Sequence, residues 1–116
     1  LPGGKQEPGE RLEDTLKREC LEEVGADVTV GELLHVAEVH RLKSGGERLH
    51  QLDFIFACTV PDDYRPALGR APDPHQVSTR WIAPEDAPQL RPAYVTKLFP
   101  LGCRREPEVY LGSHND

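Results

Sequence analysis

The stretch GKQEPGERLEDTLKRECLEEVG, residues 4–25, decides the fold of this 116-residue chain. Four side chains suited to a protein interior recur in it at every fourth position: Leu12, Leu16, Cys20 and Val24. That spacing is typical of one face of an α-helix. Gly25 follows at once and favours an end to the helix, because glycine readily adopts the left-handed conformation that closes helices. The sequence therefore predicts a helix over residues 12–24 that packs along one side.

Three carboxylates lie on this predicted helix. Glu19, Glu22 and Glu23 are spaced i, i+3 and i+4, so their side chains project from one patch. Glu19 and Glu23 fall at the edge of the apolar stripe, where clustered carboxylates repel one another and lose hydration. Protonation, cationic partners or a bound metal relieve that cost, and hard oxygen ligands suit Mg²⁺ or Mn²⁺.

A simpler interpretation is a solvated acidic face. In that case Arg18 pairs with Glu22 at i+4, and the remaining carboxylates serve solubility. The flanking residues decide between the two interpretations.

Those residues follow a longer pattern: Gly, five residues, Glu, seven residues, Arg-Glu, an aliphatic position, any residue, Glu-Glu, any residue, Gly. It is matched by Gly4, Glu10, Arg18, Glu19, Glu22, Glu23 and Gly25. A chance match is expected in roughly one of 10⁷ windows. The pattern resembles the Nudix box, and LPGGKQEPGE looks like the loop that leads into the box in mutator-type nucleoside triphosphate pyrophosphatases. Cys20 and Ala26 stand where aliphatic residues are usual.

The resemblance implies a Nudix-type α/β/α sandwich with a mixed sheet, and it implies a role for each matched residue. Glu19, Glu22, Glu23 and the carbonyl of Gly3 would be metal ligands. The alternative role for Glu22 is to orient or deprotonate the attacking water. The implied catalytic residues are Glu22, Glu23 and Arg18.

The resemblance also implies how the carboxylates are held in place and how the substrate is bound. Arg18 and Glu10 would hold the carboxylates in place, and Lys5 would bind a substrate phosphate. In some members an additional acidic base precedes a late strand, and here Asp73 is the candidate; a turn-forming aspartate is the simpler interpretation.

The implied activity is hydrolysis of the diphosphate bond in a nucleoside diphosphate linked to another group, with Mg²⁺ as cofactor and Mn²⁺ as a substitute. Nucleoside triphosphates, ADP-ribose and nucleotide sugars all remain open as substrates. The alternative is a non-catalytic Nudix-fold domain that binds a nucleotide or has a regulatory role. Its usual mark is a broken box, and this box is intact.

Composition narrows the partners and the compartment. A formal charge of −6 disfavours extended nucleic-acid binding. Three widely spaced cysteines, without a CxxC pair, favour a reducing cytoplasm. The longest apolar run, around residues 52–60, is far too short to span a membrane. We expect a small nucleotide as partner, and a homodimer stays open.

The rest of the chain suggests a sheet followed by irregular segments. Short strands are expected at residues 28–30 and 33–39, with a hairpin across 44–46 to a further strand at 48–60. A long surface loop is expected at 61–74. A strand is predicted after it at 80–82, with Trp81 in the core; the alternative for Trp81 is stacking on a nucleobase. Helical turns are predicted at 84–90 and 93–99, and a loosely held polar tail at 103–116. His35, His40, His50 and His114 show no ligand spacing.

The chain opens with Leu1 inside the loop that leads into the box. In the family this loop normally follows several strands that complete the sheet. We therefore expect residues 1–102 to form an N-terminally incomplete Nudix domain that does not fold stably by itself.

Overall fold

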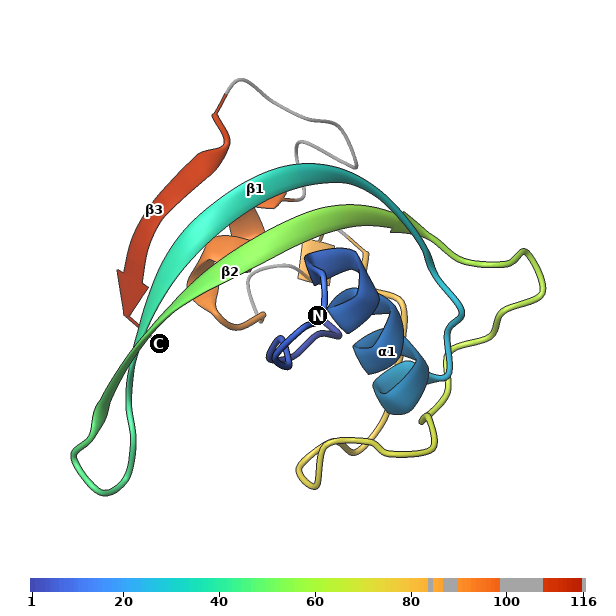
Figure 1. Cartoon of the computed structure of the whole chain (residues 1–116), viewed down its shortest axis with the longest axis horizontal. Helices are drawn as coiled ribbons and strands as arrows, with labels where there is room; N and C mark the ends of the chain where they lie inside the picture. The colour runs from blue at the N-terminus through green and yellow to red at the C-terminus, as the bar shows by residue number, and fades with distance from the viewer. Residues whose placement is uncertain (84, 87–89, 99–107, 116) are drawn as a thin grey trace. The chain divides into compact units, whose positions relative to one another are not determined.

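The computed structural model describes residues 1–83, 85–86, 90–98 and 108–115. Its elements, in chain order, are helix α1 (Leu12–Val24), strand β1 (Thr29–Leu42), strand β2 (Arg48–Thr59), the 3-10 helix η2 (Ala93–Leu98) and strand β3 (Tyr110–Asn115) (Figure 1). The chain divides into two compact units. The first holds Leu1–Gly31 and Cys58–Trp81, and the second holds Glu32–Ala57 and Ile82–Asp116.

Helix α1 of the first unit has the predicted bounds. Gly25 ends it in the left-handed conformation, with φ 65°, and its N–H donates to the carbonyl of Leu21 at 3.1 Å. This is the closure that the sequence predicts. The predicted apolar stripe is confirmed for its later members, but Leu12 is 37% exposed. Thr15 is buried on the first turns of the helix instead.

The core of the first unit forms around the last two turns of α1. Its buried members are Cys20, Val24, Ala26 and Val28. Burial raises the pKa of the Cys20 thiol to about 11. A thiol that stays protonated at neutral pH is a poor nucleophile, so Cys20 is a packing residue.

β1 and β2 form the predicted hairpin, closed by the N–H of Lys43 donating to the carbonyl of Glu47 at 2.9 Å. The two short strands expected at residues 28–30 and 33–39 are one continuous strand, since β1 runs through Gly31 and Glu32 without a break.

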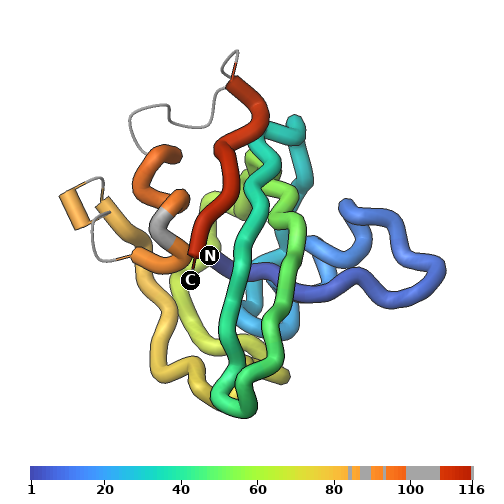
Figure 2. The backbone as a smooth tube through the Cα atoms, turned by 90° about the vertical axis from the view of Figure 1, so that its left-hand side faces the viewer, coloured from blue at the N-terminus to red at the C-terminus, as the bar shows by residue number. Residues whose placement is uncertain are grey.

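A third strand, β3, pairs with this hairpin in the described part of the chain. The strand order is β2-β1-β3 (Figure 2). β3 pairs parallel with β1, with Val36 opposite Tyr110 and Val39 opposite His114. A helix with a mixed sheet confirms the expected α/β fold. The expectation of a loosely held tail is wrong for residues 110–115, because the backbone of β1 supplies their hydrogen-bonding partners. Residues 103–107 lie outside the described part of the chain.

The second unit has its own core, built from β1, β3 and η2. Its buried members are Ala37, Val39, Tyr94, Val95 and Leu111. The hydroxyl of Tyr94 donates to the carboxylate of Asp53 at 2.7 Å, which provides a partner for a charge inside the apolar run of β2. The helical turn expected at residues 93–99 is confirmed as η2 over Ala93–Leu98, and Phe99 lies outside the described residues.

The segment before η2 differs from expectation. Residues 80–82 form no strand, and Trp81 is 67% exposed rather than buried in the core. Its ring meets that of Tyr64 edge to face, with centroids 6.2 Å apart. In the helical turn expected at 84–90, residues 85–86 are in 3-10 conformation, and 84 and 87–89 lie outside the described residues. No helix in the described part of the chain is long and apolar enough to cross a membrane.

Two valines of different burial test the core of the second unit. Val39 is fully buried and Val77 is 87% exposed. We expect Val39→Ala to lower the free energy of unfolding by about 2 kcal/mol, because it removes two buried methyl groups and leaves a cavity. Val77→Ala should change it by less than about 0.5 kcal/mol. Urea unfolding with an unchanged m value checks this, and equal midpoints for the two variants would contradict it.

Candidate active site

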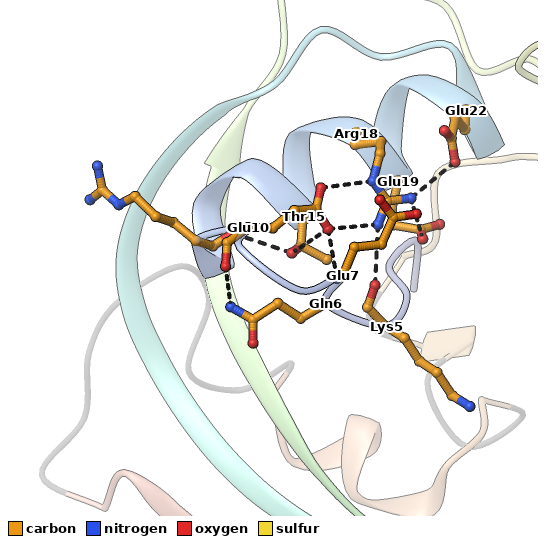
Figure 3. Close-up of polar contacts among 9 residues, drawn as sticks. Lys5, Gln6, Glu7, Glu10, Thr15, Arg18, Glu19 and Glu22 are labelled. Atoms are coloured by element: carbon orange, nitrogen blue, oxygen red, sulfur yellow. Dashed lines mark hydrogen bonds and ion pairs between the residues drawn. The ribbon is translucent and has the colours of Figure 1, made fainter.

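The guanidinium of Arg18 lies among three carboxylates at the surface of α1 (Figure 3). Its Nε and Nη2 donate to the two oxygens of Glu10 at 2.9 and 3.0 Å. Its Nη1 donates to Glu19 at 2.9 Å and to Glu22 at 3.3 Å. A bidentate ion pair of this kind fixes the relative orientation of the two side chains as well as pairing their charges. Arg18 therefore binds the loop before α1 to the carboxylates on α1.

The same contacts shift the ionisation of both partners. The hydrogen bond from Arg18, followed by that from the backbone N–H of Glu7, lowers the pKa of Glu10 from its ordinary value of 4.5 to about 2. In return, the bond to Glu10 raises the pKa of Arg18. Both groups are thus charged at neutral pH. Arg18 needs this charge to hold the neighbouring carboxylates in place, and Glu10 needs it to hold Arg18.

Glu23 lies in a different environment. Burial raises the pKa of its carboxyl group, as do a hydrogen bond shared with Glu19 and the negative charges of Glu19 and Asp73. The backbone N–H of Gly3, 3.4 Å from Oε2, opposes the shift. Among residues 1–83, 85–86, 90–98 and 108–115, Glu23 has no cationic partner. It is the least compensated carboxylate of the group.

Two glycines bring the loop before α1 against these carboxylates. Gly3 reaches Glu23 through its N–H. At Gly4 a Cβ atom would overlap the carboxylate of Glu19. Because Gly4, the second glycine of LPGG, has no side chain, the carboxylate of Glu19 can occupy this space.

The long loop after β2 holds the other end of the helix. The N–H groups of Gly69 and Ala71 donate to the carbonyls of Glu23 and Glu22, each at 2.9 Å. The hydroxyl of Tyr64 donates to the carbonyl of Val24 at 2.7 Å. Carbonyls of a last helical turn have no partner within the helix. The loop supplies these partners directly behind the two glutamates.

These loop residues were not among the candidates predicted from sequence. Gly69 has a specific reason to be glycine, because a Cβ atom there would overlap the carbonyl of Glu22. A glycine in a long loop is too common to identify that contact from sequence. Gln76 adds a side-chain donor to the carbonyl of Glu23 at 3.1 Å, and nothing local in the sequence signals it.

The predicted site residues thus lie together, with one qualification. Arg18, Glu10, Glu19 and Glu22 are joined by the contacts above, and Glu23 and Gly3 adjoin them. Lys5 contributes its backbone, since its carbonyl accepts from Arg18 Nη2 at 3.1 Å, while its exposed side chain extends away from the cluster (Figure 3). Asp73 is near enough to raise the pKa of Glu23.

Comparison with known protein families matches residues 1–100 to the NUDIX domain. The chain therefore belongs to the Nudix family, whose members in general are hydrolases of nucleoside diphosphate derivatives. No curated protein and no solved structure matches the chain.

The ion pair of Glu10 predicts a dependence of stability on pH. Because the folded-state pKa of Glu10 is lowered, its contribution is fully present above about pH 4.5 and is lost as pH falls towards about 2. Glu10→Gln removes the charge and keeps the shape. We expect the variant to melt below the wild type at pH 7, and the difference to shrink steadily below pH 4.5. Thermal melts across this range measure it, and a difference that stays constant down to pH 2.5 would refute it.

Proposed function

We propose that this protein hydrolyses the diphosphate bond of a nucleoside diphosphate linked to another group, with Mg²⁺ held by Glu19, Glu22 and Glu23. One observation carries the proposal. Three carboxylates gather on one face of α1, while the adjoining Arg18 is already engaged by Glu10. Such an arrangement leaves negative charge for a divalent cation to offset.

The donor set supports a hard cation. Burial and the neighbouring Glu19 raise the pKa of the Glu23 carboxyl group, so its negative charge is poorly compensated. A divalent ion would offset that charge. Every proposed ligand atom is an oxygen, including the carbonyl of Gly3, and all-oxygen sets suit Mg²⁺, with Mn²⁺ as a substitute.

Each residue of the proposed site would have its own role in the reaction. Such an ion would neutralise the diphosphate and make water a stronger acid. Arg18 and Glu10 keep the carboxylates in place. Glu22, whose side chain is 41% exposed and which Arg18 holds only at 3.3 Å, would orient the attacking water or accept its proton. Lys5 would bind a phosphate by swinging its exposed side chain towards the substrate.

The proposed partner is a small nucleotide, and nucleoside triphosphates, ADP-ribose and nucleotide sugars are the candidate classes. The carboxylate cluster handles only the diphosphate, so it does not choose among them. The second candidate is a domain that binds nucleotide without turnover. The complete set of three carboxylates with Arg18 favours hydrolysis over binding alone.

Glu23→Gln tests the proposal. It removes one ligand charge, and we expect kcat to fall by at least roughly 10²-fold with the fold intact. Glu13→Gln, an exposed residue in the first turn of the same helix, is the matched control and should keep wild-type activity. The measurement is phosphate or nucleotide release over a nucleotide panel, with Mg²⁺ and with excess chelator.

Activity that survives the chelator, or a fully active Glu23→Gln variant, would overturn the proposal. Tight nucleotide binding without release of any product across the panel would favour the non-catalytic alternative.

Gly4→Ala separates the geometry of the site from stability. The added methyl group would displace the Glu19 carboxylate, which is the flexible end of a side chain, so the fold should lose little. We expect Mg²⁺ binding to weaken by about 10-fold, as is usual when the support of a ligand is disturbed. Gly45→Ala, where the methyl group meets no atom, is the control. Isothermal titration with Mg²⁺ and a thermal melt give both readouts, and equal Mg²⁺ affinity in the two variants would disprove the role of Gly4.

A further inference from the structure

A second group of potential metal ligands lies in the second unit. Glu38 and His40 of β1 and His50 of β2 each offer one ligand atom, and these atoms lie within 4.8 Å of one another. His50 Nε2 is 2.9 Å from Glu38 Oε2. The rings of His40 and His50 are stacked, with centroids 4.3 Å apart and planes inclined by 18°. The sequence shows no ligand spacing among the histidines, but the fold brings His40 and His50 side by side in the sheet.

The hairpin brings these residues together. Its closing contact joins Lys43 and Glu47, and counting three residues outward on each strand places His40 beside His50. Glu38 precedes His40 by two residues and so lies on the same face of β1. The cluster therefore follows from strand register.

The neighbouring strand supports the carboxylate. The hydroxyl of Tyr110 in β3 donates to Glu38 Oε1 at 2.9 Å, while the other oxygen faces His50. A hydrogen bond of this kind orients a metal-binding carboxylate. All three strands of the sheet thus contribute to the arrangement.

We propose that Glu38, His40 and His50 bind a divalent transition metal ion of the zinc class. Two imidazoles and a carboxylate are a ligand set that zinc uses in proteins, whereas Mg²⁺ prefers oxygen alone. Ligand atoms around a tetrahedral zinc ion lie about 3.4 Å apart, given bond lengths near 2.1 Å. Because an imidazole binds a metal in the plane of its ring, the stacked rings of His40 and His50 would have to rotate as the ligand atoms close from within 4.8 Å to this spacing. The side chains of Glu38 and His50 are 31% and 55% exposed, which leaves room for that movement.

Three protein ligands leave a fourth position for another group. His40 and His50 also line a pocket of about 350 Å³, whose wall includes Arg41 and Arg48. The pocket has room for water or a small ligand, and the two arginines favour an anion. This site is separate in its chemistry from the glutamate cluster on α1, and the inference does not rest on the proposed hydrolysis.

The test is zinc titration of the protein in excess Mg²⁺, which occupies oxygen-only sites. Binding is followed by calorimetry and by the ¹⁵N signals of the imidazoles. We expect one equivalent of Zn²⁺ to shift the signals of His40 and His50. His40→Ala and Glu38→Gln should each weaken Zn²⁺ binding by at least 10-fold, while His75→Ala, which removes an exposed histidine elsewhere, should leave it unchanged.

The ¹⁵N signals of the wild-type imidazoles test Zn²⁺ binding even if a variant fails to fold. Unshifted signals of His40 and His50 at saturating Zn²⁺ would overturn the inference and leave a simple hydrogen bond between His50 and Glu38. Equal Zn²⁺ affinity in wild type and a folded His40→Ala variant would overturn it as well. Hydrolysis dependent on Mg²⁺ should be unchanged in His40→Ala, so failure of this inference is distinguishable from failure of the proposed function.

Discussion

The placement of the candidate active site depends on the guanidinium of Arg18. It joins Glu10, Glu19 and Glu22 and also holds the carbonyl of Lys5, so it connects the irregular first ten residues to α1. A guanidinium is rigid, carries its charge at any ordinary pH and offers five donors. A lysine at this position could not satisfy five oxygen atoms from two directions. The constraint also explains why Glu23, out of its reach, is the carboxylate left for another cation.

A separate set of contacts, at the C-terminal end of α1, fixes where Glu22 and Glu23 lie along the helix axis. A helix of this length is marginally stable when isolated, so tertiary contacts must hold its last turn in place. The long loop does this through donors from Tyr64, Gly69 and Ala71 to the carbonyls of residues 22–24. Because these carbonyls belong to the turn that carries Glu22 and Glu23, a displaced loop would move the carboxylates. The loop therefore acts on the site through the helix backbone.

The sequence predicts α1 and its glutamates well because both depend on local periodicity and on one glycine. It also predicts the hairpin, whose turn residues are adjacent in the chain. It does not predict β3, since a parallel partner is chosen by contacts distant in sequence and Tyr110–Asn115 has no apolar alternation to mark it. The predicted burial of Trp81 is wrong for a related reason. A hydrophobic side chain favours burial, but the sequence does not show whether other residues form a core around it. The pairing of His40 with His50 could have been predicted from the sequence, because the register of the predicted hairpin places them side by side.

The two groups of ligands differ in the kind of ion they favour. Glu19, Glu22 and Glu23 offer oxygen atoms alone, whereas the group of Glu38, His40 and His50 includes two imidazole nitrogens. Zinc binds more strongly than Mg²⁺ or Mn²⁺ to nearly any nitrogen or oxygen ligand set, so affinity alone would not keep it from the carboxylates. Availability and ligand type would have to do so: Mg²⁺ in large excess would occupy the proposed oxygen site, while imidazole nitrogens do not compete well for Mg²⁺. If both proposed sites bind metal, their different ligand sets would allow a hard ion and a softer ion to bind to one chain without exchanging places.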